Sequence, residues 1–312
     1  MVTMTRKKPK PEKIAVIDIG SNSVRLVIYD TVGTKPIMIE QTKATCRLAQ
    51  GMLQDKPRLS LQGRVKTLKA LKRFRIILGD HGVTDVVALA TAAMRAVAKT
   101  HGGETFTRQA EKALGHKIRI ISGREEARLM ARGLMAAMPG IAGICADLGG
   151  GSMELASVGA GHIHHTATLN LGSLLLYSEA KGNTLTAAYR AREQIGKVSF
   201  LRQAHGQTLY VIGGSWRAVG RLMKLAMGKP IKHVHGFAVG ASLAREKALT
   251  LAAQNPAAFS KKPKKISQRA RVLPLAAAVM VELIDAIKPA RVIFSGHGLR
   301  EGALIERLKK VG

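Results

Sequence analysis

Short apolar runs bounded by turn-forming residues predict five strands in the first part of the chain. The run IAVIDIG spans residues 14–20, and VRLVIYD follows at residues 24–30 with the alternation expected of a hairpin partner. Further strands are predicted at residues 38–48, 85–91 and 117–123. Strands that alternate with helical segments favour an α/β fold.

Apolar residues spaced three or four positions apart predict helices between and after these strands. In the first half of the chain they cover residues 61–78, 105–114 and 124–138. In the second half, segments rich in Ala and Leu predict helices at residues 240–253 and 267–287.

One pattern of strand, aspartate, glycine turn and hairpin occurs twice. The segment GICADLGGGS at residues 143–152 repeats the layout of AVIDIGSNS at residues 15–23, and two strands follow it within residues 153–170. Further glycine turns occur within residues 209–216 and 291–302. The repeat predicts two similar α/β halves that face each other, with a ligand in the crevice between them.

The repeat also sets the expected domains. Residues 14–138 would form the first domain and residues 139–312 the second, preceded by a flexible basic tail at residues 1–13. The last predicted helix, at about residues 299–310, is a candidate to pack back on the first domain.

Composition narrows the class of partner. The chain has 312 residues, of which 50 are Lys or Arg and 20 are Asp or Glu, so its formal net charge is +30 at pH 7. A positive charge of this size favours polyanionic substrates or partners. Four lysines lie in residues 255–265, which we predict to be a solvated loop. Because aromatic residues make up only 4%, a platform on which nucleic-acid bases stack is not expected.

The cysteines and the apolar stretches indicate the cellular compartment in which we expect the protein. Cys46 and Cys145 are too few for a disulfide framework, so we expect both to be reduced and buried. No apolar stretch reaches about 18 residues, which argues against a membrane span. The basic N-terminus leads into a strand and not into an apolar export segment. We therefore expect a cytoplasmic protein, and leave a homodimer open.

The two matched turns carry the first candidate chemistry. Glycine lets backbone N–H groups approach phosphate oxygens, and hydroxyl and amide side chains add donors. Both turns join the strands of a hairpin, so neither is a dinucleotide-binding or Walker A loop. One such turn would more simply close its hairpin, but the matched pair indicates a phosphate site. The candidate phosphate-binding residues here are Ser21, Asn22, Ser23, Gly149, Gly150, Gly151 and Ser152.

An aspartate precedes each turn. Asp18 and Asp147 occupy equivalent positions near the ends of their strands, and Glu154 can face the same side as the second turn. Carboxylates beside a phosphate-binding turn suit Mg²⁺, which keeps most of its water ligands in proteins. The alternative is that each aspartate caps its own turn.

The segment SGREEA begins a predicted helix. Ser122 is a candidate N-cap, with Glu125 as its capping-box partner. Glu126 is then free to polarise a water molecule, although it could simply complement the helix dipole. Arg25, just after the first turn, and Arg95, after a strand, are placed to contact phosphate.

The histidines do not predict a metal centre. His162 and His164 share one strand face, as do His233 and His235, but no cysteine or acidic residue completes a zinc spacing. His297, in the segment SGHG, is a candidate to lie near a bound phosphate.

Six motifs occur in the order found in the exopolyphosphatase and guanosine pentaphosphate phosphohydrolase family. They are DIGSNSVRLVIYD, ATAAMR, ISGREEARL, DLGGGSMEL, IGGSWRAVG and SGHGLREG. The chain resembles this family from about residue 14 to its C-terminus. The resemblance implies two ribonuclease-H-like domains around a central cleft, as in actin, Hsp70 and the sugar kinases.

The resemblance also implies roles for the motif residues. Glu126 would be the general base, and Asp147 and Glu154 the acids associated with magnesium. Arg95 would contact the phosphoryl oxygens. The residues implied to hold phosphate or to form a further loop beside it are Ser21, Asn22, Ser23, Gly149, Gly150, Gly151, Ser152, Gly214 and Ser215.

The chain departs from the family in two respects. Met153 stands where a threonine is often found, which removes no implied ligand. The chain also ends after the LREG helix, whereas long members continue into a His–Asp-type helical domain. It therefore resembles the short two-domain members, which weakens the expectation of processive action on very long polyphosphate.

We therefore expect hydrolysis of the terminal phosphoanhydride of inorganic polyphosphate, with a water activated by Glu126 and with Mg²⁺. Removal of the 5′-phosphate of guanosine pentaphosphate is the nearest alternative. An ATP-dependent kinase is another, which the SGREEARL motif disfavours. The non-enzymatic alternative is a polyanion or nucleic-acid binder, because the positive charge alone gives non-specific affinity.

Overall fold

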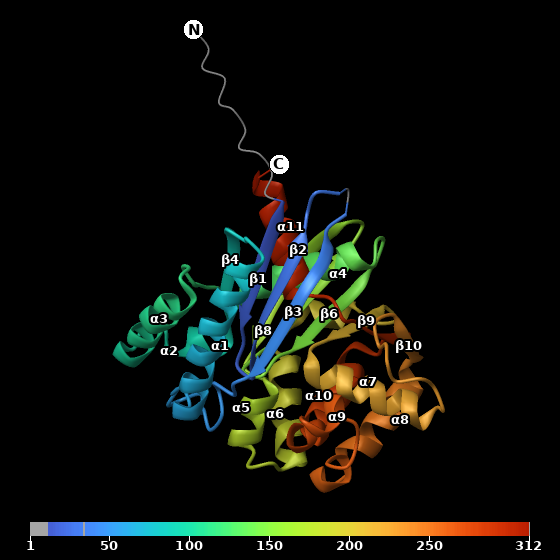
Figure 1. The fold of residues 1–312 in the computed structure, drawn as a ribbon. Coiled ribbons are helices and arrows are strands. Elements are labelled where there is room, and N and C mark those ends of the chain that lie inside the picture. The colour runs from blue at the N-terminus through green and yellow to red at the C-terminus, as the bar shows by residue number, and fades with distance from the viewer. Residues whose placement is uncertain (1–11, 34, 312) are drawn as a thin grey trace.

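The computed structural model describes residues 12–33 and 35–311. Its first sheet is built around a hairpin (Figure 1). Its order is β3-β2-β1-β4-β5, with β1 to β3 antiparallel and β4 and β5 parallel to β1. Most of the predicted basic tail lies outside the described residues. The strands are β1 (Lys13–Ile19), β2 (Ser23–Asp30), β3 (Ile37–Thr45), β4 (Asp85–Ala90) and β5 (Arg119–Ile120).

The second sheet repeats this topology. Its order is β8-β7-β6-β9-β11-β10, in which β6 to β8 form the hairpin part, β9 and β11 are parallel to β6, and β10 is an added antiparallel edge. The internal repeat and the α/β fold are thereby confirmed. The strands are β6 (Gly143–Leu148), β7 (Met153–Gly159), β8 (His162–Leu169), β9 (Thr208–Ile212), β10 (Phe237–Gly240) and β11 (Arg291–Phe294).

Helices cover both faces of both sheets. The segment before β6 contains α1 (Leu61–Asp80), α2 (Ala92–Val97), α3 (His101–Leu114) and α4 (Gly123–Ala137). The remaining helices are α5 (Ser173–Glu179), α6 (Thr184–Gly196), α7 (Gly214–Ala226), α8 (Ala241–Ala252), α9 (Lys264–Ser267), α10 (Leu273–Ile287) and α11 (Leu299–Val311), with 3₁₀ turns at Ser199–Gln203, Pro256–Phe259 and Ala270–Val272. No helix among the described residues has the length and apolar composition needed to cross a membrane.

Three helical predictions need correction. The continuous helix expected at residues 267–287 begins only at Leu273, because Pro274 lacks an N–H and is tolerated only in a first turn. Helix α3 starts at His101, four residues earlier than expected, with Thr100 as its N-cap. The expected loop at residues 255–265 contains a 3₁₀ turn held down by a buried phenylalanine, although its lysines are exposed.

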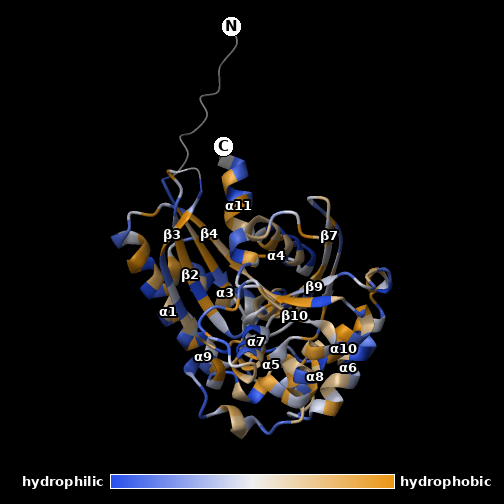
Figure 2. Ribbon diagram, turned by 90° about the vertical axis from the view of Figure 1, so that its right-hand side faces the viewer, coloured by the Kyte–Doolittle hydropathy of each residue, from blue (hydrophilic) through white to orange (hydrophobic). Residues whose placement is uncertain are grey.

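The two central helices lie between the two sheets (Figure 1). Helix α4 packs on β7 and β8 of the second sheet, whereas α11 packs on β1 of the first, and the two helices contact each other. The last helix therefore packs on the first lobe, where Leu304 joins the apolar cluster of Ile14 and Val16. Figure 2 shows the hydrophobic residues concentrated along the strands and on the helix faces toward them.

Glycines allow α4 and α11 to approach closely. A Cβ at Gly302 would lie 1.8 Å from the carbonyl oxygen of Leu129, and one at Gly133 would lie 1.9 Å from the carbonyl oxygen of Gly298. A side chain at either position would force the helices apart. This crossing fixes the N-terminal end of α4 relative to the start of α11.

We expect Gly302→Ala to lower the free energy of unfolding by about 1–3 kcal/mol, because the added methyl group overlaps backbone atoms. The matched control is Gly79→Ala in α1, where a Cβ would meet nothing within 4 Å. Urea unfolding measures both variants. Equal stability of the two variants would contradict the close helix crossing.

Candidate active site

A cleft of about 140 Å³ opens where the two lobes meet. Both glycine turns line it, together with the start of α4, the start of α7 and the start of α11. The predicted site residues that line this one cleft are Asp18, Ser21, Asn22, Ser23, Arg25, Glu126, Asp147, Gly149, Gly150, Gly151, Ser152, Glu154, Gly214 and Ser215.

The two turns have the same internal bond and touch each other. Gly20 N–H donates to the carbonyl of Ser23 at 3.1 Å, and Gly149 N–H donates to that of Ser152 at 3.0 Å. A Cβ at Gly150 would lie 2.9 Å from the Cβ of Ser21. Only glycine permits this approach, so the turns form one continuous wall.

Carbonyl groups of the turns accept hydrogen bonds from the surrounding backbone. This holds the turns in place and leaves several of their N–H groups available to a ligand. The carbonyl of Asn22 accepts from two N–H groups of residues 46–47, and that of Gly150 accepts from two N–H groups at the start of α5. Among the described residues, the N–H groups of Asn22, Gly150 and Gly151 donate to no protein acceptor. Amides held in this way can bind phosphate oxygens.

The start of α7 adds a third group of donors. Gly213 precedes it with φ +99°, a conformation that favours glycine, and a Cβ there would lie 2.7 Å from Oδ1 of Asp147. The hydroxyl of Ser215 donates to that of Ser173 at 3.3 Å, which fixes the first turn of the helix. The helix N-terminus thus points toward the same cleft, where an anion is stabilised.

The acidic residues line the same cleft as the turns. Asp18 and Asp147 are half-buried near the ends of β1 and β6. Burial raises the pKa of Asp147 to about 6, and the charge of Asp18 adds to the rise while Arg217 opposes it. Burial likewise raises the pKa of Asp18. Each aspartate therefore lies where a cation would stabilise its charged form.

Glu126 lies in the first turn of α4. The hydroxyl of Ser122 accepts from the N–H of Glu125 at 3.1 Å, as predicted for an N-cap. The carboxylate of Glu125 is paired with Arg119, however, so the expected capping box is only half formed. Burial raises the pKa of Glu126 to about 7, and Arg95 opposes this rise.

Arg95 lies behind the acids and does not line the cleft. Its Nη1 donates to Oε2 of Glu126 and to the carbonyl of Ile121, each at 2.9 Å, and its Nη2 lies 3.8 Å from Oε1 of Glu154. Glu154 also accepts from the hydroxyl of Ser152 at 2.6 Å, and burial raises its pKa. Arg95 therefore holds Glu126 in place, and its expected contact with phosphoryl oxygens stays a prediction.

The sequence reasoning missed most of the basic side of the cleft. Arg217, Arg269 and Arg300 line it beside Arg25. Burial and the neighbouring cations lower the pKa of Arg25 to about 9 and the pKa values of Arg217 and Arg269 to about 10. Arg217, in WRAVG, and Arg300, in LREG, each follow a glycine turn at the start of a helix. That position was the sequence signal that could have identified them.

Two features show that the charge of these cations is incompletely balanced within the protein. Arg25 lies directly opposite Lys43 on the neighbouring strand, a pairing of like charges that destabilises a sheet. Burial and the surrounding arginines lower the pKa of Lys43 to about 7. Nη1 of Arg300 is buried and has no hydrogen-bond partner among the described residues. A multiply charged anion in the cleft would supply the missing partners.

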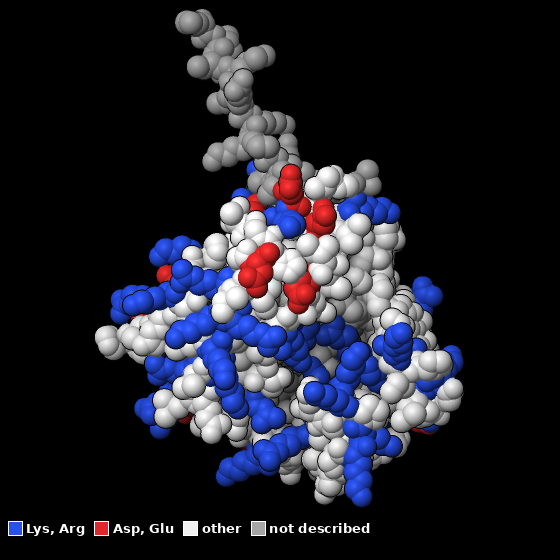
Figure 3. Space-filling view, in the orientation of Figure 1, with Lys and Arg blue, Asp and Glu red and all other residues white. Residues whose placement is uncertain are grey.

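Basic side chains also dominate the surface around the lobe junction. Figure 3 shows Lys and Arg gathered across the middle and lower part of one face, with the acidic side chains of that view near the top. This distribution attracts an anion over distances longer than a contact.

The histidines do not form a metal centre in the described part of the chain. His297, expected near the phosphate, is not among the cleft-lining residues. Its Nδ1 lies 3.4 Å from Nδ1 of His235. The expectation for His297 is thus not met, and the pairing of these two residues was not foreseen.

The acids fit Mg²⁺ held mostly through water. No group of three or more acidic, histidine or cysteine side chains among the described residues encloses an ion by itself. Mg²⁺ typically takes one or two carboxylates, with water and phosphate oxygens completing its shell. Asp147 and Asp18, buried beside the phosphate turns, match that donor set.

Comparison with known proteins identifies a family. Residues 27–311 match the family model described as the Ppx/GppA phosphatase family. A guanosine-5'-triphosphate,3'-diphosphate pyrophosphatase of Pseudoalteromonas translucida is 26% identical over 321 residues. The match covers 99% of this chain and 62% of the relative, so the chain spans less than two thirds of that protein's length.

Solved structures share the fold. An exopolyphosphatase from Cytophaga hutchinsonii has a TM-score of 0.85 at 21% identity, covering 96% of this chain and 99% of that one. A Ppx/GppA family member from Aquifex aeolicus has a TM-score of 0.76 at 23% identity, covering 96% and 98%. These likenesses confirm the expected two-lobed fold.

We expect Arg300→Met to weaken the binding of tripolyphosphate by about 10-fold or more, because a charge-assisted hydrogen bond is lost. Arg245→Met is the control, since it removes the same charge from an exposed pair with Asp285. Calorimetry without Mg²⁺ measures binding. Equal affinities of the two variants would contradict an anion site at Arg300.

Proposed function

Because the chain belongs to the Ppx/GppA phosphatase family, we propose that it hydrolyses the terminal phosphoanhydride bond of inorganic polyphosphate and releases orthophosphate. The observation that carries this proposal is the single cleft that joins two amide-lined turns, a group of arginines and a half-buried glutamate. Phosphoryl transfer needs mainly positioning and stabilisation of charge, and this cleft offers both.

The turns and arginines would hold the end of the substrate chain. Amides of Asn22, Gly150 and Gly151 are free to bind oxygens of the terminal phosphoryl group. Arg25 and Arg300 line the same cleft and would bind the following phosphates. Each phosphate brings negative charge, which removes the repulsion among the buried cations.

Glu126 would act as the general base. A carboxylate that has lost its water shell and has a pKa near 7 can accept a proton close to neutral pH. Glu126 takes one proton from water, the water oxygen forms a bond to the terminal phosphorus, and the P–O bond to the chain breaks. Arg95 keeps the carboxylate in place through its 2.9 Å hydrogen bond.

Asp147, Asp18 and Glu154 would hold Mg²⁺. The ion supplies neutralisation of charge on the phosphoryl oxygens when it is bound. The protein's own part is to fix these acids, and the 2.6 Å bond from Ser152 to Glu154 does so within the second turn.

Guanosine pentaphosphate is the second candidate substrate. The relative from Pseudoalteromonas translucida favours this substrate, because its name describes a pyrophosphatase that acts on guanosine-5'-triphosphate,3'-diphosphate. No aromatic side chain lines the cleft in the described part of the chain, so a guanine base would find no stacking partner there. This favours polyphosphate. Rates of orthophosphate release from tripolyphosphate and from guanosine pentaphosphate, measured side by side, separate the two.

We expect Glu126→Gln to lower kcat on tripolyphosphate by about 10²-fold or more, because the amide cannot accept the proton from water. Glu125→Gln is the matched control, since the neighbouring carboxylate is paired with Arg119 outside the cleft. Tripolyphosphate affinity should persist in both variants. Full orthophosphate release by Glu126→Gln would exclude Glu126 as the base.

We expect chelation of divalent ions to stop turnover, and Asp147→Asn to raise the Mg²⁺ concentration needed for half-maximal rate. The cause is loss of a buried negative charge beside the phosphate turns. Asp285→Asn, at an exposed pair with Arg245, serves as the control. A Mg²⁺ titration gives the answer, and identical curves for Asp147→Asn and the parent would rule out a metal role for Asp147.

A further inference from the structure

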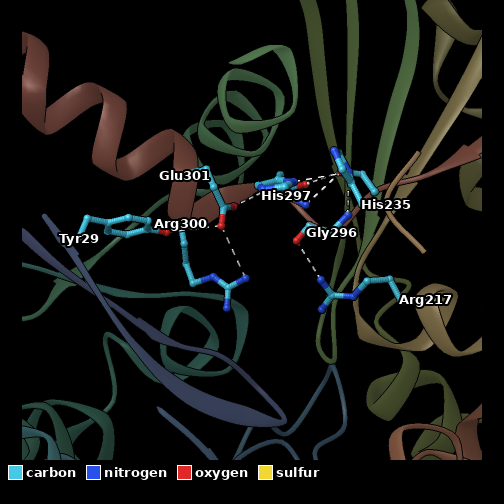
Figure 4. A network of polar contacts seen from close by, with 9 residues as sticks. Tyr29, Arg217, His235, Gly296, His297, Arg300 and Glu301 are labelled. Carbon is cyan, nitrogen blue, oxygen red and sulfur yellow. Dashed lines mark hydrogen bonds and ion pairs between the residues drawn. The ribbon is translucent and has the colours of Figure 1, made fainter. Parts of the chain in front are cut away.

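A pair of histidines lies behind the cleft, and one of them, His297, belongs to the loop that follows β11. Figure 4 shows His235 and His297 side by side, with Gly296 between them and Arg217. The rings meet edge to face with centroids 4.4 Å apart. His235 comes from the segment between α7 and β10, so the contact joins two loops distant in sequence.

Gly296 connects His235 to the cleft. Its N–H donates to Nδ1 of His235 at 3.4 Å, and its carbonyl accepts from Nη1 of Arg217 at 3.0 Å (Figure 4). Arg217 lines the cleft and is half-buried. Gly296 therefore links the ring of His235, through its N–H, to the guanidinium of Arg217, through its carbonyl. A movement of the ring would move Arg217 as well.

The bond from Gly296 requires a particular form of the ring. Nδ1 can accept from an N–H only when it carries no proton itself. Burial and the nearby His297 lower the pKa of His235 below its usual value, and Glu301 opposes them weakly. The neutral ring is therefore the form that this structure favours at neutral pH.

Other groups around His235 complete its surroundings. The hydroxyl of Ser295 lies 3.4 Å from its Nδ1 and is itself bonded to both the N–H and the carbonyl of His297. Lys224 of α7 is bound to the carbonyl of His233 two residues away. A proton on Nδ1 would thus face a second imidazole and an N–H group, and Glu301 is the one acid that favours it.

The same loop is anchored at its other end beside Arg300. The N–H of Gly298 donates to Oε2 of Glu301 at 2.7 Å, while the other oxygen of Glu301 lies 3.9 Å from Nη2 of Arg300 and 3.5 Å from the hydroxyl of Tyr29 (Figure 4). A shift of this loop would therefore move two cleft arginines together.

We propose that His235 is a positioning residue for Arg217: its neutral imidazole holds Gly296 in place, and its protonation releases the loop and weakens polyphosphate binding. This inference rests on the proposed function only for the identity of the anion. The affinity for a phosphate chain should fall as the pH drops below about 6.5, the usual pKa of histidine, by more than the substrate's own protonation explains.

The test compares tripolyphosphate binding at pH 5.5 and pH 7.5, measured by calorimetry without Mg²⁺. His235→Asn keeps an acceptor oxygen near the position of Nδ1 but cannot take up a charge. We expect it to bind about as well as the parent at pH 7.5 and to lose roughly tenfold less affinity on acidification. His235→Ala, which has no acceptor, should bind more weakly at both values. An equal loss in parent and His235→Asn would overturn the proposal.

The amide resonance of Gly296 gives a second readout that needs no ligand. In the parent its chemical shift should follow a titration below pH 6.5, and in His235→Asn this titration should be absent. Retention of the titration in the variant would contradict the link. If tripolyphosphate binds in this pH-dependent way but is never hydrolysed, the proposed function fails while the role of His235 stands.

Discussion

The contact between the two glycine turns is the constraint on which the rest of the site depends. Gly150 lies so close to Ser21 that no side chain fits between them, and Gly172 packs against the backbone of Gly151 at a distance that excludes a Cβ. The turns come from the same position in two repeated lobes. Their amides are therefore brought together by topology, and no long loop is needed to assemble the phosphate site.

The cleft brings together acidic and basic side chains whose charged forms are both disfavoured by burial. Burial raises the pKa values of Asp147 and Glu126, whereas burial and mutual repulsion lower those of Arg25 and Lys43. Such an arrangement costs folding free energy. A polyanion bound by the arginines and a divalent cation bound by the acids would stabilise both sets of charges, and unfavourable buried charge of this kind is common in binding sites.

Local patterns allowed part of this site to be predicted from the sequence. The paired turns and the position of Glu126 depend on residues a few positions apart. The basic side could not be found this way, because one arginine among 50 basic residues is marked only by its neighbours in space. Arg95 illustrates the limit, since its place after a strand suggested phosphate, whereas the fold directs it to Glu126. The His235–His297 contact likewise joins positions 62 residues apart.

The central claim is that the two glycine turns, at Asn22 and at Gly150, bind one phosphoryl group beside Glu126. A crystal structure of the Glu126→Gln variant with tripolyphosphate bound tests it most directly. The account predicts the terminal phosphoryl group between Asn22 and Gly150, with the substituted side chain at hydrogen-bond distance from a water on its open face. A chain bound with its terminus outside this gap, or contacting one turn only, would contradict the account.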